Sequence, residues 1–191
     1  MGEQPQSGDG LVMPEAFPCK SKDINAENVR AASGKLKSMG QTIDSRMDTI
    51  VGLWNGLPGV YVAPEAEQAY GLMKPAAEAS ETIKSKFEKA AGALDDFASA
   101  IEPVKTELKS LESEAAAFRS ATLSEYGDTW RDHQEVVDHN NELLSRYARV
   151  VETLTTAAAS CARTRSMGCW MGWSCLRWRV FRRMRSCSPG R

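Results

Sequence analysis

The clearest structural signal in this chain is residues 83–118, IKSKFEKAAGALDDFASAIEPVKTELKSLESEAAAF. Apolar residues recur in it at alternating intervals of four and three over five heptads, which predicts one long helix with an apolar seam. The seam consists of Ile83, Phe87, Ala90, Leu94, Phe97, Ile101, Val104, Leu108, Leu111, Ala115 and Phe118.

This helix is predicted to span residues 64–120. Pro64 suits a first helical position, and Glu65 and Glu67 complement the positive end of the helix dipole. Pro103 lies inside the run, where it removes one backbone hydrogen bond. Because the register continues across it, we expect one helix kinked at Pro103. The alternative is a break near Glu102 and a four-helix arrangement.

A second heptad pattern predicts a helix over residues 24–54, with Asp23 as its N-cap. Its seam contains Val29, Leu36, Ile43 and Ile50. The stretch Trp54-Asn55-Gly56-Leu57-Pro58-Gly59 follows, and its Gly and Pro residues predict a turn.

A third helix is predicted over residues 123–162, after a turn at 119–123. Thr122 and Glu125 have the spacing of a capping box, which favours a helix start there. One seam contains Trp130, Val137, Leu144 and Val151, and the other contains Tyr126, His133, Asn140, Tyr147, Leu154 and Cys161.

These patterns predict an all-α fold, an elongated antiparallel helical hairpin or bundle of three long helices. At 1.5 Å per residue, a 57-residue helix would be roughly 85 Å long, so the two shorter helices cannot cover its whole seam. The uncovered seam predicts a partner helix, either from a second copy in a homodimer or from a related helical protein. Residues 1–22 contain Pro5, Pro14 and Pro18 with Gly and Ser, and we expect them to be a disordered leader.

The charge of the chain is divided unevenly. Residues 163–191 contain eight Arg and no acidic residue, so the first 162 residues hold 16 basic and 25 acidic side chains. The net charge of −1 therefore hides an acidic body and a basic tail. The average charge of the chain predicts no nucleic-acid partner. No apolar run is long enough for a transmembrane helix, and residues 1–10 lack the pattern of a secretory signal peptide.

The sequence offers no arrangement typical of catalysis. His133 and His139 are six residues apart and do not share a helix face. No HExxH, GxxxxGK[ST], GxGxxG or GxSxG motif occurs. We therefore expect no enzyme, no metal, no cofactor and no small-molecule substrate. His133 and Asn140 occupy seam positions, where a polar residue fixes the register of packing.

A helix, a Trp-x-Gly turn and an antiparallel helix together resemble the WXG-type (ESAT-like) substrates of type VII secretion. The motif here is Trp54-Asn55-Gly56. The residues that follow it, 57–65, resemble the helical domain that leads longer actinobacterial members, and the resemblance covers roughly residues 24–160. It implies export without a cleaved signal peptide, pairing with a helical partner, and recognition of Trp54 and Gly56 by the type VII secretion machinery.

The chain departs from this family in two respects. Members are commonly near 100 residues with one hairpin, whereas a third helix is predicted here. Many carry Tyr-x-x-x-Asp/Glu after the last helix, but Tyr147 is followed at that spacing by Val151 and Tyr126 by Trp130. An export signal could therefore come from a partner chain. The alternative localisation is cytoplasmic, for a coiled-coil scaffold that is not exported.

The tail, residues 163–191, is rich in Arg and Trp, and such a segment could bind an anionic membrane or a nucleic acid. A frameshift is the competing hypothesis. Reading the third base of each codon with the next two bases, residues 167–174 encode Gly-(Leu/Val/Met)-Leu-Asp-Gly-(Leu/Val/Met)-Val when Ser174 uses a TCN codon. That frame resembles an amphipathic continuation of the third helix, so we expect a frameshift near Arg163.

Overall fold

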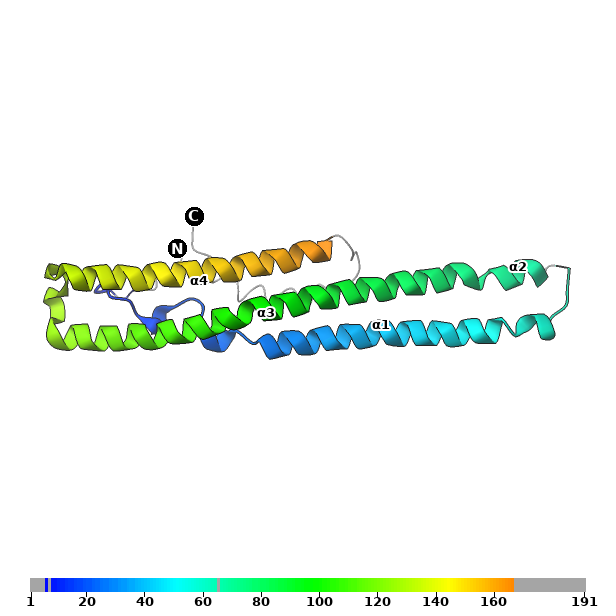
Figure 1. Ribbon diagram of the computed structural model, residues 1–191, viewed down its shortest axis with the longest axis horizontal. Coiled ribbons are helices and arrows are strands. Elements are labelled where there is room, and N and C mark those ends of the chain that lie inside the picture. The colour runs from blue at the N-terminus through cyan, green and yellow to red at the C-terminus, as the bar shows by residue number, and fades with distance from the viewer. Residues whose placement is uncertain (1–5, 7, 65, 167–191) are drawn as a thin grey trace. The chain divides into compact units, whose positions relative to one another are not determined.

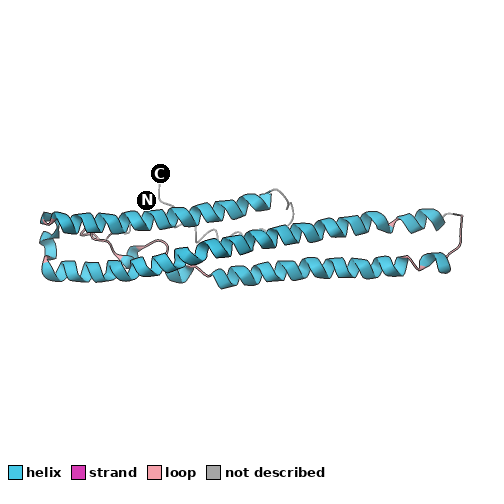
Figure 2. Cartoon of the chain, viewed as in Figure 1, coloured by secondary structure: helices cyan, strands magenta, loops and turns pink. Residues whose placement is uncertain are grey.

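The computed structural model describes residues 6, 8–64 and 66–166. Three long α-helices dominate the described chain: α1 (Ala26–Trp54), α3 (Met73–Glu125) and α4 (Gln134–Ser166) (Figure 1). The short helix α2 (Ala66–Gly71) precedes α3. Four 3-10 turns complete the order: η1 (Pro14–Ala16), η2 (Ser21–Asp23), η3 (Leu57–Gly59) and η4 (Gly127–Asp132). The predicted all-α class is confirmed, and Figure 2 shows these helices joined by loops.

The described residues form two compact units. Unit 1 holds the residues up to Ala26 and Phe97–Ala162, and unit 2 holds Glu27–Asp96 and residues 163–166. The two units share α3, which continues through Pro103 without a break. The prediction of one helix across this proline is therefore confirmed.

Unit 2 is an antiparallel hairpin of α1 and the first part of α3. Ser33 Oγ donates a hydrogen bond to the Ala91 carbonyl at 3.0 Å, and Lys84 Nζ lies 2.5 Å from Asp44 Oδ2. A Cβ on Gly40 would lie 3.1 Å from the Cβ of Phe87, so the missing side chain lets the two helices approach closely. Positions later in α1 meet positions earlier in α3, as in the antiparallel hairpin expected from the sequence.

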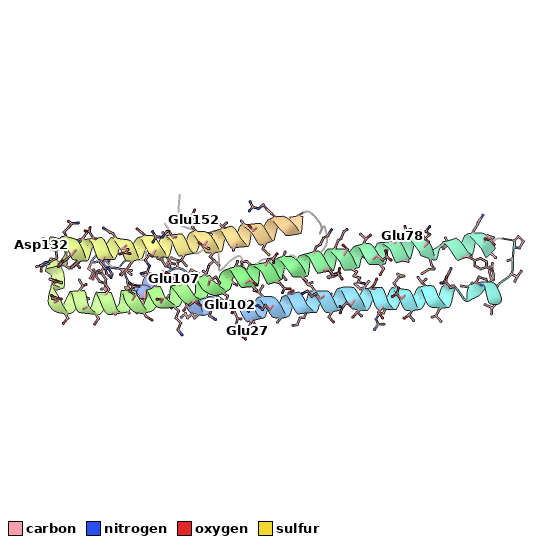
Figure 3. All side chains as sticks on the ribbon, in the orientation of Figure 1. Glu27, Glu78, Glu102, Glu107, Asp132 and Glu152 are labelled. Atoms are coloured by element: carbon pink, nitrogen blue, oxygen red, sulfur yellow. The ribbon has the colours of Figure 1, made fainter. Side chains whose placement is uncertain are left out.

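In unit 1, the second part of α3 pairs with α4 in the same antiparallel sense. The rings of Phe118 and His139 are 4.7 Å apart, and Arg146 forms ion pairs with Glu107 and Glu114. Figure 3 shows the labelled Glu107 on the side of α3 that faces α4.

The prediction of a disordered leader is wrong for residues 8–22, which the structure describes. Residues 8–24, which we name the N-terminal segment, pack against α3 and α4 and contribute core residues to unit 1. Leu11 and Val12 are completely buried, and Phe17, Cys19 and Ile24 are buried as well. Hydrogen bonds to side chains of α4 hold the segment in place. Its Pro and Gly residues shape turns such as η1, and its apolar residues provide the burial that stabilises them.

Three predicted boundaries are also wrong. The helix predicted over 64–120 is divided at Leu72, because the ring of Pro75 would clash with the Gly71 carbonyl in a continuous helix. Thr122 is not a helix start: it is buried within α3, and its carbonyl accepts the Tyr126 amide. The turn comes later, at Gly127, whose φ of +54° ends the helix in the left-handed region. Asp23 lies in η2 rather than at a helix N-cap.

Candidate functional site

The predicted recognition motif lies where α1 ends. Trp54 is the last residue of α1, and its indole Nε1 donates a hydrogen bond to the Ala69 carbonyl of α2 at 3.1 Å. The amide of Asn55 donates to the Val51 carbonyl at 2.9 Å, which continues the helical pattern for one more residue. Trp54 therefore ties α1 to α2 across the turn, and Asn55 and Gly56 are exposed.

Gly56 lies where a side chain would have little room, and its backbone conformation is an ordinary one. Its φ is −80°, which any residue can adopt. A Cβ at this position would lie 3.3 Å from the Leu53 carbonyl oxygen, which is a crowded contact. The Gly56 amide donates to that same carbonyl at 3.1 Å. A larger residue would therefore require the Leu53 carbonyl to move by a few tenths of an ångström.

Apolar side chains around this turn are exposed. Val60 and Val62 are 87% and 91% exposed, and Leu53 and Leu72, on either side of the turn, are 76% and 66% exposed. Tyr70 Oη donates to the Tyr61 carbonyl at 2.5 Å and holds part of the loop against α2. The turn thus presents an apolar surface on a backbone fixed by hydrogen bonds.

The predicted seam residues fall into three classes of burial. Seven are buried: Leu36, Phe97, Ile101, Leu108, Leu111, Trp130 and Val151. Seven are half-buried: Val29, Ile43, Phe87, Leu94, Phe118, Val137 and Leu144. Two, Ile50 and Ile83, are exposed, so their predicted packing within the chain is wrong.

The exposed large apolar residues are concentrated in unit 2. In the described chain, eight belong to it: Met39, Ile50, Leu53, Val60, Tyr61, Val62, Leu72 and Ile83. Unit 1 has Leu123. The reason lies in the number of packed segments. Among the described residues, unit 1 has the N-terminal segment beside α3 and α4, whereas unit 2 consists mainly of the hairpin of α1 and α3 with the short helix α2. Two long helices are too few to enclose the apolar side chains of unit 2.

Helical geometry places part of this exposed set on one side of the hairpin. At 100° per residue, Met39 and Ile50 lie about a quarter turn from Gly40, which contacts α3. Ile83 lies about a quarter turn, in the same rotational sense, from the α3 residues that contact α1. When residues on two antiparallel helices are rotated by the same angle, in the same sense, away from the helix–helix contact, they lie on the same side of the pair. We name Met39, Ile50 and Ile83 the open face of unit 2.

The two histidines lie against aromatic rings. The His133 ring is 4.1 Å from that of Tyr126, between centroids, and His139 lies against Phe118. Among the described residues, no group of three His, Cys, Asp or Glu side chains is arranged to hold a metal ion. A shallow depression on α1 is lined by exposed side chains of that one helix: Ser38, Gln41, Thr42, Ser45 and Arg46. It is too open to enclose a ligand.

Ion pairs between α1 and α3 shift two pKa values. The hydrogen bond from Lys37 lowers the pKa of Asp95 below its ordinary value. The hydrogen bond to Asp44 raises the pKa of Lys84. Both shifts favour the charged forms, so these pairs support the hairpin without creating a group poised to exchange protons near neutral pH.

The contacts of Asn140 and Tyr147 with the N-terminal segment were missed by sequence reasoning. Asn140 Oδ1 accepts the Val12 amide at 2.8 Å, and Tyr147 Oη accepts the Cys19 amide at 2.9 Å. The available signal was the apolar content of the supposed leader, chiefly Leu11, Val12 and Phe17. It shows no helical or strand periodicity, so pattern analysis did not connect it with α4.

No helix among the described residues has the length and apolar character needed to cross a membrane. Residues 167–191, including the predicted frameshifted tail beyond the end of α4, lie outside the described chain. Comparison of the chain with protein-family models, with curated proteins and with solved structures finds no match.

Proposed function

We propose that this chain is a non-catalytic secretion and assembly module that acts by helix–helix pairing through the open face of unit 2. The observation that carries the proposal is the unequal exposure of apolar residues, eight large ones in unit 2 against one in unit 1 among the described residues. Burial of apolar surface is the main driving force of association. A two-helix hairpin with one apolar side gains this energy by adding helices from a partner.

The proposed partner is a second copy of the chain or a related helical protein. Two hairpins meeting by their open faces would form a four-helix arrangement, with the large apolar residues at its centre. The resemblance of Trp54-Asn55-Gly56 to the WXG motif supports the type VII route of export. The position of Trp54 at the end of one helix of an antiparallel pair agrees with that resemblance.

Matched variants on α3 test the pairing. Ile83 and Leu123 are 40% and 39% exposed, but Ile83 lies in unit 2 and Leu123 in unit 1. We expect the unchanged chain to sediment as a dimer. We expect Ile83→Glu to weaken dimerisation at least about tenfold, because it places a charge in an apolar interface. The control Leu123→Glu should leave the dimer unchanged. Equal behaviour of the two variants would contradict pairing through the open face.

Export is tested separately, in the native host with and without its type VII membrane ATPase. We expect the protein in the culture supernatant only when the ATPase is present, and Trp54→Ala to reduce that signal. Protein confined to the cell pellet in both strains would refute export and favour the alternative of a cytoplasmic scaffold. Deleting residues 163–191 tests the remaining alternative, since it would abolish membrane or nucleic-acid binding through the tail.

A further inference from the structure

Side chains of α3 and α4 bind the backbone of the N-terminal segment rather than only its side chains. Asn140 accepts the Val12 amide and donates Nδ2 to the Gly10 carbonyl at 3.3 Å. Tyr147 Oη accepts the Cys19 amide and donates to the Cys19 carbonyl at 3.3 Å. Each of the two side chains thus satisfies a donor and an acceptor of the segment, which is how proteins recognise extended peptides.

The spacing of these two contacts is matched on both partners. Asn140 and Tyr147 are seven residues apart, so they lie on one face of α4 and are separated by about 10 Å. Val12 and Cys19 are also seven residues apart, a distance of roughly 23 Å in an extended chain. The 3-10 turn η1, Pro14–Ala16, shortens this path. The turn therefore brings both backbone contacts into register with the helix.

Both ends of the segment are held on α3. Asp9 Oδ2 lies 2.7 Å from Arg119 Nη2. The amide and the hydroxyl of Ser21 both donate to the carboxylate of Glu112, each at 2.7 Å. Between these clamps the Phe17 ring stacks on Tyr147, with the ring centroids 4.2 Å apart. We name Glu112, Arg119, Asn140 and Tyr147 the acceptor surface.

The segment is joined to the helix that follows it by a short connection. Ile24 is its last residue, and α1 begins at Ala26 and belongs to unit 2 from Glu27 onward. All the contacts above lie within unit 1. A segment of the same sequence delivered by another molecule would therefore make the same contacts.

From this arrangement we infer that the acceptor surface is a peptide-binding site, and that the N-terminal segment of a second copy can replace the chain's own segment in it. This inference is independent of pairing through the open face, because it uses different residues in the other unit. Exchange requires the resident segment to leave first. The observed affinity for an added segment is therefore lower than the intrinsic affinity, in proportion to the fraction of chains whose acceptor surface is open. Weakening the resident segment should then strengthen binding of an added one.

The experiment measures fluorescence anisotropy of a labelled synthetic peptide of residues 6–24 with the full chain. All chains carry Ile83→Glu, so that pairing through unit 2 is weakened in every sample to the same extent. We expect Phe17→Ala in the chain to increase peptide affinity at least tenfold, because its own segment loses the ring that stacks on Tyr147. Adding Tyr147→Phe should weaken binding at least fivefold, since it removes both hydrogen bonds and keeps the ring. A control peptide with Phe17→Ala should bind weakly.

Mixing two full-length variants tests exchange between copies. A Phe17→Ala chain has an N-terminal segment that binds weakly and an intact acceptor surface. A Tyr147→Phe chain has an intact N-terminal segment and a weakened acceptor surface. We expect a one-to-one complex only in the mixture. Asp9→Asn, which loses the ion pair with Arg119, replaces Phe17→Ala if that variant loses its helical circular dichroism. Absence of peptide binding to a folded chain with a weakened segment, or binding unaffected by Tyr147→Phe, would overturn the inference.

Discussion

Asn140 is predicted to be a seam residue between helices, but in the structure it binds the backbone of the N-terminal segment. Its place in the heptad pattern predicts a polar seam residue that fixes register. It is 2% exposed, and its side chain binds the backbone at Gly10 and Val12, on a segment 128 to 130 residues earlier in the chain. Its buried amide is thereby paired on both its oxygen and its nitrogen, which offsets the cost of removing it from water.

A substitution at Gly10 tests whether the backbone conformation of the N-terminal segment contributes to the stability of the folded chain. Its φ is +83°, and a Cβ there would lie 2.7 Å from Arg131 Nη2, which donates to the neighbouring Asp9 carbonyl. We expect Gly10→Ala to lower the free energy of unfolding by about 1–2 kcal/mol, because L-residues are strained in this conformation. Gly8→Ala is the control, since a Cβ at Gly8 meets nothing within 4 Å. Chemical denaturation measures both, and equal losses would contradict this account.

The Lys37–Asp95 pair, with Nζ and Oδ2 2.8 Å apart, predicts a pH dependence. Its hydrogen bond lowers the pKa of Asp95, so the pair stabilises the folded chain above the ordinary value of 3.8. That contribution is lost as the pH falls through the lowered value. We expect Lys37→Met to reduce stability by less than about 1 kcal/mol near neutral pH, because the pair is largely exposed. The difference in Tm between the two proteins should shrink below pH 3.8. A constant difference would refute the assignment.

In α4, part of the predicted apolar seam is displaced by one residue from the residues that are buried in the structure. The buried stripe contains Val136 and Leu143, whereas the predicted seam used Val137 and Leu144, which are half-buried. Both sites are apolar doublets, so a shift of one residue leaves an apolar side chain at each position. The direction from which the N-terminal segment and α3 approach decides which member of each doublet is buried.

Replacing Pro103 tests how much a proline in the interior of α3 lowers the stability of this helix. The residue is exposed, and it has no amide to donate to the carbonyl four residues earlier. We expect Pro103→Ala to raise the free energy of unfolding by about 1–3 kcal/mol, since alanine restores a helical hydrogen bond. Thermal unfolding followed by circular dichroism would show the rise in Tm. The nearby exposed Lys105→Ala should change stability by less than about 0.5 kcal/mol. A loss of stability in Pro103→Ala would show that the helix depends on the proline.

For the molecule as a whole, the two units are expected to differ in stability. The large, completely buried apolar residues include Leu11, Leu108, Leu111 and Leu143, which all belong to unit 1. In the described part of unit 2, Leu36 is the one large apolar residue that is buried, and it is 5% exposed. Less apolar burial means a lower free energy for local opening.

Amide hydrogen exchange tests this difference. At dilutions where the chain is monomeric, we expect amides of residues 104–115 and 140–154 to exchange about a hundredfold more slowly than those of 36–51. Raising the protein concentration should slow exchange in 36–51, because pairing covers the open face. Ile83→Glu should remove that dependence on concentration. Equal protection in both units would contradict the assignment of the open face.

The helices could be predicted from sequence because their signal is local: apolar residues three and four positions apart share a face whatever they pack against. This holds for α1, α3 and α4, for continuity at Pro103 and for the turn after Trp54. The position of residues 8–24 could not be predicted, since an extended segment without periodicity is defined by partners more than a hundred residues away, such as Asn140 and Tyr147. The exposure of Ile50 on α1 and Ile83 on α3 likewise depends on how many segments surround each part of these two helices. That number follows from tertiary packing, because an apolar stripe shows only that something must cover it.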